Sequence, residues 1–70
     1  MQKPSIGRIV HLRGLDGIVV PAIIVRVMEE TVDLIVFRPS VEPSPLNAVP
    51  YHETDLDSWF WPFRILFARL

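Results

Sequence analysis

A chain of 70 residues with a formal net charge of −1 can form one domain, and its hydrophobic fraction of 50% is sufficient for a small core. Cysteine is absent and the two histidines lie far apart, so we expect no disulfide, no metal site and no cofactor. The charge excludes the basic field that holds a nucleic-acid backbone, and no apolar run approaches the roughly 18 to 20 residues of a membrane-spanning helix.

The first apolar stretch has the β-branched content and the alternation of a short strand. Residues 6–12 predict this strand, in which Val10 and Leu12 share the buried face. His11 alternates with them and is therefore expected on the outer face. The glycines and the aspartate of residues 13–17 then predict a turn, because glycine adopts positive φ without steric cost.

The middle of the chain predicts a hairpin. Residues 18–28 form its first strand, and Pro21 is expected to mark an edge, a bulge or a strand start because it cannot donate to a ladder. The well-paired part is expected at residues 22–27, connected by a tight polar turn to residues 32–37 within a strand at 31–38. The side chains expected in the core are Ile23, Val25 and Val27 on the first strand and Val32, Leu34 and Val36 on the second.

The second half of the chain is richer in turn signals. Residues 39–50 carry four prolines, which predicts an irregular, partly extended loop, with a short returning strand at residues 48–52. The three acids of residues 53–57 predict a solvated turn. Trp59 and Trp61 then share one side of the chain, and Phe60 between them faces the other.

Four or five short strands in so short a chain suit an all-β fold, in which closure into a small barrel removes exposed sheet edges. The spacing Gly7-x-x-Val10-x-Leu12, followed by a loop and a longer apolar strand, is similar to that of SH3-like barrels. We therefore expect a single SH3-like β-barrel domain over residues 1–70 with an apolar C-terminal tail at residues 63–70. Fold likeness of this kind implies no particular function.

Four blocks of the sequence resemble a family of small bacteriophage and prophage proteins with no agreed activity. The blocks are KPSIGRIVH at residues 3–11, PAIIVRV at 21–27, VPY at 49–51 and WFWP at 59–62, and they occur in the family's order. Phe60 stands where the family has a histidine between the two tryptophans. The resemblance implies a phage protein. The absence of cysteine and of an export signal leads us to expect it in the cytoplasm of the host bacterium.

The first hairpin also resembles that of toxin endoribonucleases with SH3-like barrels. Val20 stands where those enzymes carry a catalytic arginine, so this resemblance departs from the family at its key position. His11 and His52 have no nucleophile or orienting acid at a diagnostic spacing. We therefore expect no catalytic residue and no enzymatic activity.

The sequence favours a binding protein whose partner is a host or virion protein. Trp59 and Trp61 either close the core or form an aromatic binding surface, since tryptophan suits both roles. The tail is too apolar to be fully absorbed by the core, so we expect a homo-oligomer with an interface formed by Phe63, Leu66, Phe67 and Leu70.

An alternative function is an oligomer that sequesters a small anionic ligand, such as a nucleotide signal, between subunits. The residues expected to contact phosphate are Arg8, Arg26 and Arg38, with a tryptophan stacking on the ligand.

Overall fold

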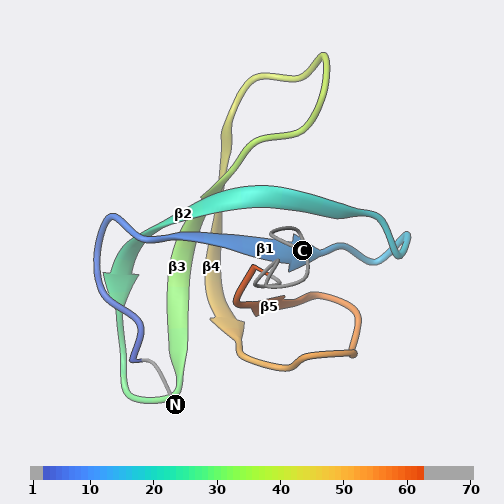
Figure 1. Ribbon diagram of the computed structural model, residues 1–70. Coiled ribbons are helices and arrows are strands. Elements are labelled where there is room, and N and C mark those ends of the chain that lie inside the picture. The colour runs from blue at the N-terminus through green and yellow to red at the C-terminus, as the bar shows by residue number, and fades with distance from the viewer. Residues whose placement is uncertain (1–2, 63–70) are drawn as a thin grey trace, which may run out of the picture.

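The computed structural model describes residues 3–62, which form five antiparallel strands in one curled sheet (Figure 1). The strands are β1 (Ile9–Arg13), β2 (Val19–Val27), β3 (Thr31–Val36), β4 (Ser44–Pro50) and β5 (Ser58–Phe60). Their order in the sheet is β4-β3-β2-β1-β5. The all-β prediction with a central β2–β3 hairpin is confirmed, and the architecture is consistent with an SH3-like barrel. Within the described residues there is no helix, and so none that could cross a membrane.

The sheet curls until its two ends approach each other. Tyr51, which directly follows β4, forms an isolated parallel bridge with Trp59 of β5. The next backbone amide, that of His52, donates to the carbonyl oxygen of Trp59 at 3.0 Å. The chain after one edge strand therefore covers part of the other edge strand.

The core lies on the concave side of this sheet. Val10, Leu12 and the three predicted residues of β3 are buried, as alternation with polar neighbours indicated. The complete buried apolar set is Val10, Leu12, Val20, Ala22, Ile24, Val32, Leu34, Val36, Val49 and Trp59.

The predicted register of β2 is wrong. Ala22 and Ile24 are buried, whereas Ile23 is only partly buried and Val25 is 43% exposed. Pairing of Ile24 with Leu34 puts the even-numbered residues on the core side, and a bulge between Ile24 and Arg26 then makes Val25 an extra residue. Beyond the bulge Val27 lies opposite the buried Val32, but it is itself 39% exposed.

Two prolines also lie where the sequence did not place them. Pro21 is inside the central strand β2, where its carbonyl oxygen accepts the amide hydrogen of Phe37 at 3.0 Å. Its nitrogen faces the same neighbour, just beyond the end of β3, so the missing amide hydrogen leaves this pair with one hydrogen bond instead of two. β4 begins at Ser44 rather than in the predicted 48–52 segment, and Pro45 is tolerated because β4 is an edge strand.

Candidate docking surface

The outer side of the sheet carries a row of apolar side chains that crosses four strands. Ile9 of β1 lies opposite Ile23 of β2, Ile23 opposite Ile35 of β3, and Ile35 opposite Pro45 of β4. Ile9 is 59% exposed, Pro45 is exposed, and the two central isoleucines are partly buried. This row lies on the side opposite to the core.

A second row runs beside the first. His11 of β1 lies between Pro21 of β2 and Phe60 of β5 and is paired with both. Phe37, the first residue after β3, extends the row on the other side of Pro21 and donates its amide hydrogen to the Pro21 carbonyl oxygen. The His11 and Phe60 rings meet edge to face, with centroids 5.5 Å apart. The outer apolar face is defined here as the two rows together: Ile9, Ile23, Ile35, Pro45, Phe37, Pro21, His11 and Phe60.

This face is unusual for an antiparallel sheet with one side in solvent, where polar residues normally alternate with the buried ones. Charged side chains occur only towards its two ends. Arg13 lies at one end, with its guanidinium 4.8 Å from the centroid of the Phe60 ring and donating to the Glu53 carbonyl oxygen at 3.1 Å. Arg26 lies at the other end opposite Asp33, whose carboxylate accepts the Ala48 amide hydrogen at 2.8 Å.

The two edges of the sheet are less suited to pairing with another strand. β4 contains Pro45 and Pro50, which have no amide hydrogen, and Ala48 adopts a positive φ of 55°. β5 has only three residues, and the segment after β4 already contacts it. An incoming chain therefore meets a better surface on the outer face than at either edge.

The two predicted tryptophans differ in their surroundings. Trp59 is 3% exposed and packs edge to face against Tyr51 and Trp61, with ring centroids 4.9 and 5.2 Å away. Its ring therefore closes the core. Trp61 is partly buried, and the Arg8 guanidinium lies 5.4 Å from its ring centroid. The indole nitrogens of both residues are buried without a hydrogen-bond acceptor in the structure.

The three predicted arginines do not meet at one place. Arg8 lies beside Trp61, whereas Arg26 and Arg38 lie at opposite ends of the β2–β3 hairpin. Arg38 borders a hollow of about 260 Å³ together with Asp16 of the β1–β2 turn. The predicted interface residues Phe63, Leu66, Phe67 and Leu70 lie outside the described part of the chain.

Sequence reasoning missed the outer apolar face. The available signal was that consecutive residues, which point to opposite faces of a strand, are both apolar, as in Ile9 with Val10 and Ile23 with Ile24. In a strand with one face in solvent, polar and apolar residues are expected to alternate. Consecutive apolar residues therefore indicate a strand that is covered on both faces.

The polar groups of residues 3–62 include no group of three or more possible metal ligands. Tyr51 donates its hydroxyl hydrogen to the Glu53 carboxylate at 2.8 Å. This hydrogen bond, together with burial and the charge of Glu53, raises the pKa of Tyr51. Both residues border a cavity of about 350 Å³ that is also lined by Arg13, Phe60 and Trp61.

No match to this chain was found among protein-family models, among curated proteins or among solved structures.

Proposed function

We propose that this domain is a non-enzymatic binding protein that docks on another protein through its outer apolar face. The observation that carries the proposal is the pair of apolar rows crossing all the strands of the sheet on the side away from the core. Apolar surface removed from water contributes about 25 cal/mol per Å², and contiguous exposed apolar patches commonly mark interaction sites.

The two ends of the face carry charges of both signs. Arg13 lies at one end against the acidic turn of residues 53–57, and Arg26 lies at the other end opposite Asp33, where the β2–β3 turn also carries Glu29–Glu30. The apolar middle of the face therefore carries the proposed contact, and the charges at its ends can pair with charges of either sign on a partner. The resemblance to phage proteins makes that partner a host or virion protein.

The proposal is tested by a matched pair of charge substitutions. Ile9→Lys places a cation in the outer apolar face, whereas Leu15→Lys makes the same kind of change at a 76% exposed position in the β1–β2 turn. Both residues are largely solvated, so both variants are expected to fold. The tagged proteins are expressed in infected cells, and co-purifying proteins are quantified by mass spectrometry.

We expect Leu15→Lys to recover the same partner as the parent, and Ile9→Lys to lose about tenfold or more of it, as an interface hot spot does. A folded Ile9→Lys variant that retains the partner at the parental level contradicts the proposal.

The contact between Arg8 and Trp61 supports the second candidate, an oligomer that sequesters a small anionic ligand. The Arg8 guanidinium lies over the Trp61 ring, and a cation held in this way can bind an anionic group. Native mass spectrometry of the purified protein distinguishes the two functions. Sequestration predicts multimers with bound nucleotide, whereas protein docking predicts a ligand-free chain.

A further inference from the structure

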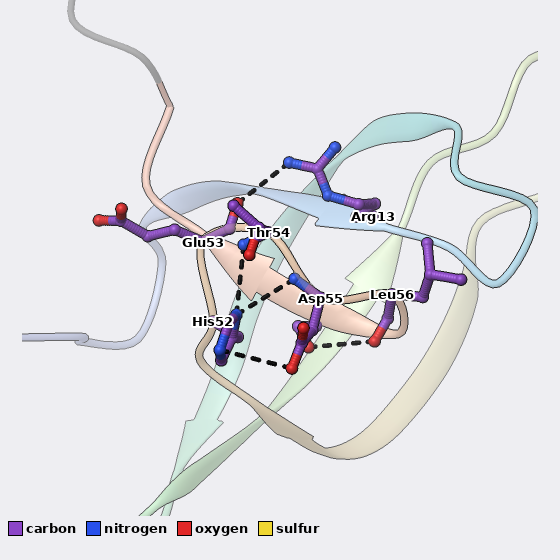
Figure 2. A network of polar contacts seen from close by, with 7 residues as sticks. Arg13, His52, Glu53, Thr54, Asp55 and Leu56 are labelled. Carbon is purple, nitrogen blue, oxygen red and sulfur yellow. Dashed lines mark hydrogen bonds and ion pairs between the residues drawn. The ribbon is translucent and has the colours of Figure 1, made fainter.

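His52 organises the turn between β4 and β5 by accepting backbone hydrogen bonds. Figure 2 shows its ring below the turn, where Nδ1 receives the amide of Thr54 at 3.3 Å and the amide of Asp55 at 3.1 Å. An imidazole nitrogen that accepts cannot carry a hydrogen, so this geometry requires the neutral ring with its hydrogen on Nε2. Nε2 lies 3.4 Å from the Asp55 carboxylate.

The same turn holds groups that line a cavity and reach the outer apolar face. The Glu53 carbonyl oxygen accepts the Arg13 guanidinium, and the Glu53 carboxylate accepts the Tyr51 hydroxyl (Figure 2 shows the Arg13 contact). Glu53 and Thr54 border the cavity of about 350 Å³ that also contacts Phe60. The conformation of the turn therefore sets one wall of this cavity and the position of Arg13.

We propose that protonation of His52 releases this turn, which makes it a pH-sensitive element of the domain. The imidazolium ion carries a hydrogen on both nitrogens and accepts none, so the amides of Thr54 and Asp55 lose their acceptor. Among the side chains, histidine is the one whose charge changes under mildly acidic conditions. The Asp55 carboxylate faces Nε2 at 3.4 Å and attracts the charged ring, so the turn stays tethered by this ion pair while the two backbone amides leave Nδ1.

The response is local rather than global. Thr54 and Asp55 are exposed, so water can satisfy their amides once the imidazole no longer does. Within residues 3–62, four other charged or titratable groups lie around the turn, apart from the Tyr51 hydroxyl. Asp55 faces the ring, Glu53 accepts the Tyr51 hydroxyl, Arg13 donates to the Glu53 carbonyl oxygen, and the exposed Asp57 donates its amide hydrogen to the Arg13 carbonyl oxygen. Of these groups and the ring, only the imidazole accepts the two amide hydrogens, so loss of that acceptor is assigned to protonation of His52.

The test uses the full-length protein and a His52→Asn variant. The asparagine side-chain oxygen can accept amide hydrogens two and three residues ahead, and it takes up no proton in this range. A His11→Asn variant controls for the other histidine. The amide resonances of Thr54 and Asp55 and the ring resonances of His52 are followed by NMR through a pH titration.

In the parent and in His11→Asn, we expect both amides to shift with the same midpoint as the His52 ring and their solvent exchange to accelerate on protonation. In His52→Asn both amides should keep their resonances over that range. Amides that do not move while His52 titrates overturn the proposal, as does the same shift in His52→Asn. Ring nitrogen shifts of the parent at neutral pH test it without any variant, because a hydrogen on Nδ1 contradicts the acceptor role.

Discussion

Ile23 of β2 lies opposite Ile35 of β3 on the outer side of the sheet, one residue away from the Ile24–Leu34 pair in the core. The two central strands therefore carry branched apolar side chains on both faces. One face forms the core, and the other forms the middle of the outer apolar face. This duplication explains both the error in the predicted register and the proposed docking function.

The corrected register predicts opposite outcomes for two truncations in the central hairpin. Leu34→Ala removes a fully buried side chain and should cost about 2–5 kcal/mol, which approaches the whole stability of a small domain. Val25→Ala truncates a 43% exposed residue at the bulge and should change stability by about 0.5 kcal/mol or less. Urea unfolding measures the free energy of unfolding of both variants. An equal decrease in the two variants would show that Val25 is a core residue and that the corrected register is wrong.

Tyr51 is the only tyrosine of the chain, so its ionisation can be followed directly by ultraviolet absorbance. Its hydrogen bond to Glu53 raises the pKa above the usual value of 10.0. Because the folded pKa exceeds the unfolded one, the interaction stabilises the fold below a pH of about 10, and its contribution is lost as the pH rises through the folded value. Glu53→Gln should lower the pKa of Tyr51, whereas Glu42→Gln in the β3–β4 loop should leave it unchanged. An unchanged pKa in Glu53→Gln would show that the hydrogen bond is not its cause.

We expect no hydrolysis of RNA, DNA, esters or phosphoesters. His11 packs against Phe60 on the outer face, and His52 is engaged with the backbone of its own turn. His52 faces the Asp55 carboxylate at 3.4 Å, but within residues 3–62 neither histidine is hydrogen-bonded to the hydroxyl nucleophile that such catalysis requires. Turnover that disappears in a His11→Ala variant would contradict this expectation.

The apolar tail gives a prediction that rests on the sequence alone. Deleting residues 64–70 should convert an oligomer into a folded monomer if Phe63, Leu66, Phe67 and Leu70 form an interface, because these side chains exceed what so small a core absorbs. Light scattering and thermal unfolding of both forms measure the mass and the fold. A full-length protein that is already monomeric, with its tail protected from proteolysis, would assign the tail to the barrel instead.

The sequence predicted the strands well where the two faces differ in polarity. Val10 and Leu12 alternate with His11 and Arg13, and β3 alternates with polar residues near its start, so their buried faces were recognisable. β2 has apolar residues on both faces, and only its pairing with β3 determines which of them are buried. β4 was mistaken for a loop because a strand with several prolines is tolerated where the missing amide hydrogens have no ladder partner, as at a sheet edge, and edge position is a property of the whole sheet.

The candidate site was harder to predict than the fold. An outward isoleucine such as Ile9 has the same residue type as a core isoleucine, so composition assigns both to the interior. The sequence left Trp59 open between the core and a binding surface because tryptophan suits both roles, and packing against Tyr51 and Trp61 makes it part of the core. The contacts of His52 with backbone amides depend on turn geometry that no residue pattern specifies.

The most direct test of the docking proposal is isoleucine methyl NMR of the full-length protein with and without the partner recovered from infected cells. Ile9, Ile23 and Ile35 lie in the outer apolar face, whereas Ile24 is buried and Ile18 is exposed in the β1–β2 region. The proposal predicts that the methyl resonances of the first three shift on binding, while those of Ile24 and Ile18 change little. Shifts confined to Ile18, or binding that leaves the methyl resonances of Ile9, Ile23 and Ile35 unchanged, would contradict it.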